Sequence, residues 1–280
     1  MNFDTLVLSS GGVNCFNTLG ALQYLYDKKL LSNLNTFVGS SIGTMISYLM
    51  AINIEPSKCI SYFMSNQLLM KLNKPDFFFL FNKKNGIFNY EIIENTLIDI
   101  TLNQGKKLMT LKELYDMYEK TLIVCTYNLT QDKLEYLNYK THPNLPCLTA
   151  VRMGCSAPIF FGDFYYMGDF YTDGAVIDYF PIDIPEIQGK NILGITSVKT
   201  ENKYVKLELN NIFSYLEHIL TLHTKNEYVN KLKKVLKEKN IKIIILNENK
   251  VYWGKLNVSN KFILDCFSFG YSFVKNLNCI

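Results

Sequence analysis

A serine flanked by glycines is the feature of this sequence that most strongly indicates chemistry. Residues 39–43 read Gly-Ser-Ser-Ile-Gly, the pattern G-x-S-x-G, between a predicted strand and a predicted helix. In that context the pattern predicts a sharp strand-to-helix turn that exposes the central serine. The N–H groups and the dipole of the helix that starts at Ile42 favour negative charge on that serine. We therefore predict Ser41 as a nucleophile, and Gly39 and Gly43 as residues whose lack of a side chain the turn requires.

A second glycine-rich turn follows the first predicted strand. Ser10-Gly11-Gly12-Val13 stands at the carboxyl end of that strand, which in a parallel sheet is the edge that also carries Ser41. We predict that the backbone N–H groups of Gly11, Gly12 and Val13 form an oxyanion hole, in which one donor contributes about 3–4 kcal/mol. Neither G-x-G-x-x-G nor G-x-x-x-x-G-K-[ST] occurs, which argues against a nucleotide site.

A serine nucleophile also needs a base, and the three histidines are poorly placed for that role. His142 lies in a Thr-His-Pro-Asn turn, while His218 and His223 lie on one late predicted helix. Surface or interhelix positions are their more common use. Asp173, in an Asp-Gly-Ala turn after a short strand, offers a carboxylate instead.

The elements that must position these residues alternate between strands and helices. After the helix that ends at 154, a connection rich in Pro, Gly and aromatic residues leads to Asp173. The opening order of strand, helix, strand and helix predicts an α/β fold with a mostly parallel central sheet. Strands are predicted at 3–9, 37–38, 121–127, 133–139, 191–197 and 241–246, and helices at 17–30, 42–53, 57–72, 90–103, 111–119 and 147–154. We expect a catalytic domain over 1–200 and a mainly helical C-terminal extension over 201–280 packed on it.

Composition narrows the function classes. The chain has 280 residues, of which 48% are hydrophobic and 19% charged, as in globular proteins. Its net charge of +4 comes without a dense Lys/Arg run, which argues against nucleic acid as a partner. The seven cysteines show no C-x-x-C and no zinc spacing, so we expect reduced, buried thiols and no metal. Because no apolar stretch approaches the ~18 residues of a membrane span, and no signal-peptide pattern opens the chain, we expect a cytoplasmic protein whose membrane contact is peripheral.

Two aromatic clusters leave alternatives open. Residues 77–81 read Phe-Phe-Phe-Leu-Phe and precede Lys83 and Lys84. This cluster is either a lid or membrane-docking loop, with the lysines toward anionic headgroups, or a buried strand or helix edge. The second cluster, Phe160 and Phe161 with residues 164–166, either lines an acyl tunnel or fills the core.

In their order along the chain, these motifs resemble the patatin-like phospholipase family. Residues 8–12 resemble its glycine-rich oxyanion loop, residues 39–43 its G-x-S-x-G serine, and Asp173 with Gly174 its D-G-[AG] motif. Segments 86–89, 155–161 and 173–181 resemble further parts of the family pattern, so the resemblance covers about residues 3–198.

The first loop departs from the family pattern at three positions. Ser10 replaces one glycine, Asn14 stands where Arg or Lys is usual, and Cys15 replaces a small glycine. The backbone N–H donors of the loop are retained despite these replacements.

The resemblance implies a three-layer patatin-like fold and a lipid acyl hydrolase of the phospholipase A or lysophospholipase type. It implies that Asp173 accepts the proton of Ser41, which attacks an ester carbonyl, without a metal or cofactor. The substrate would be a phospholipid or another acyl lipid at a membrane surface. Two alternatives remain: an esterase or thioesterase acting on soluble acyl substrates, and a catalytically weak lipid-binding protein that retains the fold.

Overall fold

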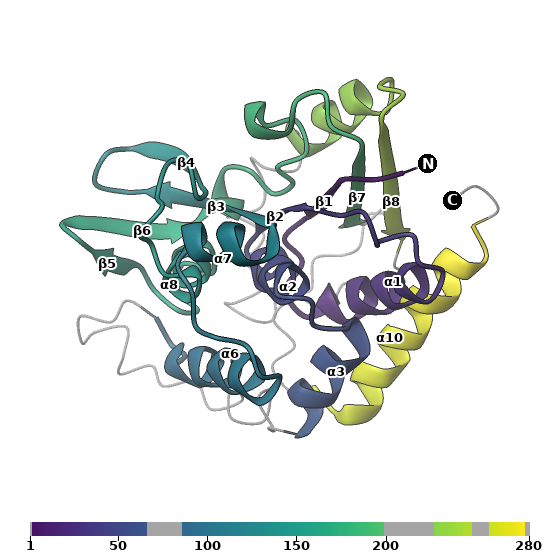
Figure 1. Ribbon diagram of the computed structural model, residues 1–280, viewed down its shortest axis with the longest axis horizontal. Helices are drawn as coiled ribbons and strands as arrows, with labels where there is room; N and C mark the ends of the chain where they lie inside the picture. The colour runs from purple at the N-terminus through teal and green to yellow at the C-terminus, as the bar shows by residue number, and fades with distance from the viewer. Residues whose placement is uncertain (1, 66–85, 199–226, 248–257, 278–280) are drawn as a thin grey trace, which may run out of the picture.

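An eight-stranded sheet runs through the centre of the computed structural model, which describes residues 2–65, 86–198, 227–247 and 258–277 (Figure 1). The strand order is β5-β6-β3-β2-β1-β7-β8, and β4 also pairs with β3. Strands β1, β2, β3, β7 and β8 pair in parallel, while β4, β5 and β6 pair antiparallel. The bounds are β1 (Thr5–Leu8), β2 (Thr36–Ser40), β3 (Thr121–Asn128), β4 (Lys133–Leu137), β5 (Phe164–Tyr166), β6 (Asp169–Asp173), β7 (Ile192–Val198) and β8 (Ile241–Asn247).

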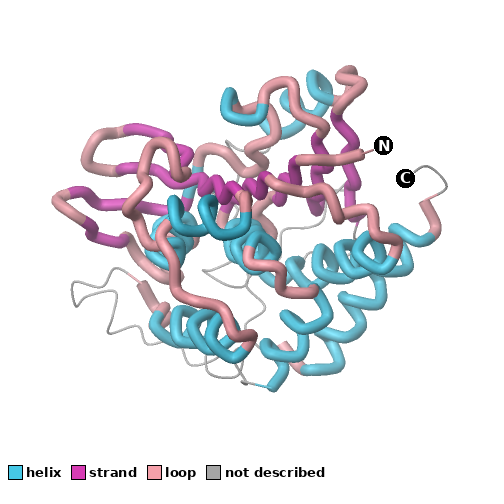
Figure 2. Tube along the Cα trace, in the orientation of Figure 1, coloured by secondary structure: helices cyan, strands magenta, loops and turns pink. Residues whose placement is uncertain are grey.

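Helices cover both faces of the sheet and make a three-layer arrangement (Figure 2). The larger core lies on the face covered by most helices, whose bounds are α1 (Cys15–Asp27), α2 (Ile42–Ala51), α3 (Pro56–Ser65), α6 (Glu91–Asn103), α7 (Leu111–Tyr118), α8 (Cys147–Gly154) and α10 (Asn260–Lys275). On the other face a smaller core joins the sheet to segment 180–187 and to the helix at 227–235. The predicted α/β fold with a mostly parallel central sheet flanked by helices is confirmed.

Local sequence explains where several elements begin. Strand β1 reads Thr-Leu-Val-Leu, with all four side chains buried, as expected of a central parallel strand. Thr110 and Glu113 form a capping box that starts α7, and the Ser259 hydroxyl caps α10. These caps satisfy N–H groups that the first turn of a helix leaves without partners.

The chain after residue 200 contributes to both the sheet and the helical layer. Strand β8 pairs with β7 along its whole length, and α10 packs against α1. The backbones of these two helices touch, because a Cβ at Gly20 would lie 1.9 Å from the Phe267 carbonyl oxygen and one at Gly270 would lie 1.9 Å from that of Asn17. Side chains larger than hydrogen do not fit at this crossing.

The region between α8 and Asp173 differs from the sequence expectation. It contains the β5–β6 hairpin, in which Tyr165 pairs with Phe170 and their rings lie 5.0 Å apart. Met167 and Gly168 both have positive φ, which turns the chain between the two strands. The aromatic residues of both strands favour this pairing, which the glycine and proline content obscured. The 77–81 cluster lies outside the described residues.

Candidate active site

Ser41 lies on the turn between β2 and α2 and has a strained backbone, with φ 53° and ψ −128°. Residues other than glycine rarely adopt such a conformation, so the surrounding structure must hold it. A Cβ at Gly39 would lie 2.3 Å from the Thr44 nitrogen, and one at Gly43 would lie 2.5 Å from the Leu8 carbonyl oxygen. Both flanking positions therefore need glycine for the turn to close.

Strand pairing along β3 brings Asp173 to Ser41. Strand β4 pairs with one edge of β3, while β2 and β6 pair with the other edge, one after the other. Ser40, the last residue of β2, pairs with Cys125, and Asp173, the last residue of β6, pairs with Thr126. The two strands thus meet end to end. As a result, the Ser41 side chain lies close enough to the Asp173 carboxylate to lower its pKa.

The Asp173 carboxylate is almost completely buried, with 2% of the residue exposed. Burial raises its pKa to about 7, against hydrogen bonds from the Ser41 side chain and the Ala175 N–H, which lower it. The Ala175 nitrogen lies 2.9 Å from the carboxylate oxygen. A carboxyl group that titrates near neutral pH is suited to act as a general base, because it takes up a proton more readily than an ordinary aspartate.

Residues Gly11, Gly12 and Val13 follow β1 at the same edge of the sheet as Ser41. Gly12 has φ 52°, a conformation that favours glycine, and opens a 3₁₀ turn over Gly12–Asn14. The contact that Gly43 makes with the carbonyl oxygen at the end of β1 places this loop beside the first turn of α2. Among the histidines, His142 lies in the turn after β4, whereas 218 and 223 fall outside the described residues.

The segment after Asp173 ties the nucleophile strand to the smaller core. A Cβ at Gly174 would lie 2.5 Å from the Cys125 sulfur, so this position also needs glycine. The Asp178 carbonyl oxygen accepts a hydrogen bond of 2.8 Å from the Ser40 hydroxyl. The Ser10 N–H, in the glycine-rich loop, donates to the Tyr179 carbonyl oxygen at 3.0 Å. One segment therefore contacts the nucleophile strand, the candidate oxyanion loop and the candidate base.

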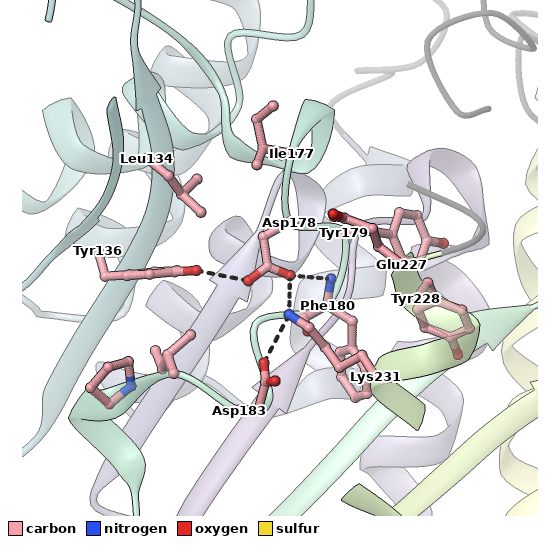
Figure 3. Close-up of a pocket in the computed structure, with 12 residues that line it drawn as sticks. Leu134, Tyr136, Ile177, Asp178, Tyr179, Phe180, Asp183, Glu227, Tyr228 and Lys231 are labelled. Carbon is pink, nitrogen blue, oxygen red and sulfur yellow. Dashed lines mark hydrogen bonds and ion pairs between the residues drawn. The ribbon is translucent and has the colours of Figure 1, made fainter. Parts of the chain in front are cut away.

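The segment after Asp173 is also held by a buried ion pair between Asp178 and Lys231 (Figure 3). The Asp178 carboxylate accepts hydrogen bonds from the Tyr136 hydroxyl at 2.8 Å and the Lys231 ammonium at 2.7 Å. Lys231 also lies 2.9 Å from the Asp183 carboxylate. A cavity of about 280 Å³ adjoins these groups, but none of the residues predicted to do chemistry lines it. The cavity is therefore separate from the Ser41–Asp173 pair.

The carboxyl end of α8 holds a buried arginine that sequence reasoning missed. Arg152 is 9% exposed; it donates to the Ser156 hydroxyl at 2.9 Å and to the Phe161 carbonyl oxygen at 3.0 Å. Its guanidinium lies 4.2 Å from the centre of the Tyr90 ring, and burial lowers its pKa. As the one basic residue in the apolar stretch 147–154, Arg152 carried a signal that could have marked this site.

The phenylalanines of the second aromatic cluster pack against the segment that precedes α6. Phe160 stacks on Phe88 with ring centres 6.2 Å apart, and Phe161 meets the Tyr90 ring edge-on at 5.5 Å. A Cβ at Gly86 would lie 2.5 Å from the Gly162 nitrogen, so the two segments are also in backbone contact. These contacts join the motif segments 86–89 and 155–161 beside the end of α8.

The geometry of the Ser41 turn and its neighbouring carboxylate agrees with comparison to known proteins. A family model described as patatin-like phospholipase matches residues 6–185. The chain belongs to the patatin-like phospholipase family. The family predicted from the ordered motifs is thereby confirmed.

Relatives of this patatin-like chain include viral proteins. It is 32% identical over 185 residues to the "Probable lipid hydrolase 463L" of Invertebrate iridescent virus 6; this match covers 65% of the chain and 63% of the relative. It is 26% identical over 253 residues to the "Uncharacterized protein R571" of Acanthamoeba polyphaga mimivirus, covering 87% and 83% of the two sequences. The chain thus matches less than two thirds of the first relative's length.

Two bacterial structures share the fold of this patatin-like chain. VipD from Legionella pneumophila superposes with a TM-score of 0.56 at 18% identity, over 99% of this chain and 67% of VipD. ExoU, in its heterodimeric complex with SpcU from the type III secretion system of Pseudomonas aeruginosa, gives 0.55 at 15% identity, over 98% of this chain and 50% of ExoU. At these identities the likeness concerns the fold.

The described residues contain neither a helix that could span a membrane nor a cluster of metal ligands. No helix there has the length and apolarity needed to cross a membrane. Within the same ranges, no three His, Cys, Asp or Glu side chains are grouped so as to hold a metal ion. The six cysteines in these ranges, Cys15, Cys59, Cys125, Cys147, Cys155 and Cys266, are free and buried.

Proposed function

We propose that the chain is a serine lipid acyl hydrolase of the phospholipase A or lysophospholipase type, with Ser41 as nucleophile and Asp173 as base. The observation that carries the proposal is the strand register that brings the serine on its strained turn beside a buried carboxylate, whose pKa burial raises to about 7. Membership of the patatin-like phospholipase family and the name of the iridescent virus relative support a lipid ester as substrate.

The reaction begins when the Ser41 oxygen attacks the ester carbonyl carbon and its proton passes to Asp173. The N–H groups of Gly11, Gly12 and Val13, with the amino end of α2, stabilise the charge that develops on the carbonyl oxygen. The C–O bond to the alcohol then breaks, and the alcohol leaves with the proton from Asp173. A water molecule, deprotonated by Asp173, attacks the acyl-enzyme; the bond to the Ser41 oxygen then breaks, that oxygen takes the proton back from Asp173, and the fatty acid leaves.

The strained turn favours this role for Ser41. At the start of a helix, a serine hydroxyl ordinarily accepts a hydrogen bond from an N–H of the first turn. Ser41 makes no such bond, and its hydroxyl is directed to Asp173 instead. A base hydrogen-bonded to the nucleophile, in a site from which water is largely excluded, is the arrangement that acyl transfer requires.

The test is fatty-acid release from mixed phospholipid vesicles, together with covalent labelling by a fluorophosphonate. Ser41→Ala and Asp173→Asn are compared with the wild type. The matched controls are Ser32→Ala, at an exposed serine, and Asp265→Asn, at an exposed aspartate on α10. We expect both site variants to lose release and labelling, while both controls keep them. Undiminished release by Ser41→Ala would refute the mechanism.

Soluble and lipid substrates are separated in the same experiment. Release is measured with a short-chain ester below and above the concentration at which it forms micelles. A jump in rate on micelle formation supports the lipid hydrolase, and equal rates favour an esterase acting on soluble substrates. Vesicle binding without release or labelling by the wild type would indicate a lipid-binding protein that retains the fold.

A further inference from the structure

The β5–β6 hairpin carries large apolar side chains into solvent at one end of the sheet. Its strands are joined by Met167 and Gly168, whose φ values of 50° and 102° make the two-residue turn that is typical of tightly paired strands. Met167 is 87% exposed, and Tyr165 and Phe170 on either side of it are 59% and 45% exposed. The tip of the hairpin is therefore an apolar surface.

The β3–β4 turn extends this surface. The Leu129 N–H donates to the Phe170 carbonyl oxygen at 2.8 Å, and the Phe170 N–H donates to the Thr130 hydroxyl at 2.9 Å, so the two turns lie side by side (Figure 1). Leu129 is 48% exposed. We name Leu129, Tyr165, Met167 and Phe170 together the hairpin patch.

The hairpin patch lies beyond the sheet edge that carries Ser41. Strand β3 continues for three residues past Cys125, the partner of Ser40, and those residues pair with β6. At about 3.3 Å a residue, Phe170 lies roughly 10 Å along β6 from Asp173. One short strand thus connects the patch to the candidate base.

The other face of the hairpin is fixed to the protein. Phe164 and Tyr166 are partly buried, with ring centres 6.3 Å apart, and the Arg152 guanidinium lies 5.2 Å from the centre of the Phe164 ring. Because side chains alternate along a strand, Tyr165 and its partner Phe170 point the opposite way. The protein therefore holds the patch in a defined position.

Packing inside the protein does not account for a methionine at the tip. A two-residue turn in which both φ values are positive favours Asn or Asp before Gly, because these residues tolerate the left-handed conformation. Met167 departs from that preference, and its exposed side chain buries little surface in return. Contiguous apolar surface of this kind marks a place that a partner covers.

The chemistry of the patch favours the interface of a zwitterionic bilayer as that partner. Aromatic rings and a flexible methionine suit the boundary between headgroups and acyl chains. In the two hairpins, residues 127–136 and 163–173, the one cation is Lys133, which lies 3.8 Å from the Glu135 carboxylate, among five acidic residues. Anionic headgroups would gain nothing from this charge, so apolar insertion is left as the driving force.

A second copy of the chain is the other partner that a hairpin at a sheet edge could meet. Within the described residues, β5 is the outermost strand on its side of the sheet. It has only three residues, and strands this short offer little backbone for edge-to-edge pairing. What the hairpin exposes most is the side chain at its tip, past the end of β5.

We propose that the hairpin patch docks the protein on a zwitterionic lipid surface and thereby brings the sheet edge with Ser41 and Asp173 to its substrate. The inference rests on the proposed function, which supplies the lipid substrate, and it names the element that meets the bilayer.

The experiment measures flotation with phosphatidylcholine vesicles in the Ser41→Ala background, so that hydrolysis does not alter the vesicles. Met167→Asn removes the apolar tip and gives the turn a residue that it favours, and Leu129→Ser removes the neighbouring side chain. The matched controls are Met117→Asn, on the helix that precedes the amino end of β3, and Leu264→Ser, at a leucine on α10 that is 47% exposed. Thermal melting checks that each variant is folded.

We expect Met167→Asn to lower the partition coefficient about 10-fold, the effect of withdrawing one apolar side chain from lipid, and the double variant with Leu129→Ser to lower it about 30- to 100-fold. Both controls should bind like the Ser41→Ala parent. Raising NaCl from about 0.05 M to about 0.5 M should change binding by less than about twofold, because screening does not weaken apolar insertion.

Hairpin variants that float like the controls would overturn the inference. So would binding that requires anionic phosphatidylglycerol and disappears at high salt. Size-exclusion chromatography tests the other partner: a dimer that Met167→Asn converts to a monomer assigns the patch to a second copy and also overturns the inference.

Two outcomes separate this inference from the proposed function. A wild type that binds vesicles through the patch but releases no fatty acid and takes up no fluorophosphonate refutes the proposed function alone. A wild type that releases fatty acid while its hairpin variants bind vesicles undiminished refutes the docking inference alone.

Discussion

Replacing Asp173 by asparagine removes a carboxylate that folding buries at a cost. Its pKa rises from the ordinary value of 3.8 to about 7, mainly through burial. The folded chain therefore keeps this proton at a pH where the unfolded chain has lost it, and stability falls as the pH rises between these two values. The rise corresponds to roughly 4 kcal/mol of unfolding free energy that the wild type has lost above pH 7.

Asparagine fits the same site without that cost. Its side-chain oxygen can accept the Ala175 N–H as the carboxylate does, and its amide can donate to the Ser41 hydroxyl. We expect Asp173→Asn to become progressively more stable than the wild type as the pH is raised from 4 to 8, by up to about 4 kcal/mol. The same variant should be catalytically inactive, so stability and activity change in opposite directions.

Urea unfolding followed by circular dichroism, at half-unit steps from pH 4 to 8, measures this difference. Asp265→Asn, at an exposed position on α10, is the control for the loss of a surface carboxylate. A stability difference between Asp173→Asn and the wild type that stays constant over this range would refute the reasoning. So would a difference that grows as the pH falls, because it would mean that the native carboxylate is stabilised by its surroundings.

Two further pairs of substitutions test the geometry around the site. Gly43→Ala should prevent the turn from closing and abolish soluble folded protein, because its Cβ would lie 2.5 Å from a backbone oxygen of β1. The control Gly11→Ala should fold normally, since the nearest atom to its Cβ is 3.7 Å away. Expression yield and thermal melting distinguish the two variants. Lys231→Met should lower the unfolding free energy by about 3–5 kcal/mol, because it leaves the buried Asp178 carboxylate without its cation. In the control Lys234→Met, the lysine side chain that is removed is 75% exposed, so the unfolding free energy should change by less than about 1 kcal/mol. Urea titrations measure both.

Local patterns in the sequence predicted the elements, while the meeting of distant residues came from the pairing register. The glycines around Ser41 and the apolar runs on either side define β2, the turn and α2, because each depends on neighbours in sequence. That β2 and β6 share one edge of β3 is a different matter. It depends on β2 and β6, which both lie far from β3 in sequence, pairing with the edge that β4 leaves open, and no local pattern encodes those contacts.

The contacts of Arg152 and Cys155 were hidden for a related reason. A lone cysteine in an apolar segment is most often a small buried residue, and the hydrogen bond from Cys155 to the Ser41 carbonyl oxygen arises only when α8 is packed on β3. The short strand before Asp173 was expected, but its partner β5 was obscured because it has only three residues and lies among turn-forming residues. In each case the deciding contact is tertiary.

The close crossing of α1 and α10 has a consequence for how the protein is made. Helix α1 follows the glycine-rich loop directly, yet the surface around Gly20 is covered by a helix that ends at Lys275. A ribosome releases the chain from its amino end, and domains complete themselves as their segments emerge. The nascent chain therefore carries its nucleophile turn long before it can assemble the layer that supports the neighbouring loop. We therefore expect the contact between α1 and α10 to form only after residue 275 has left the ribosome.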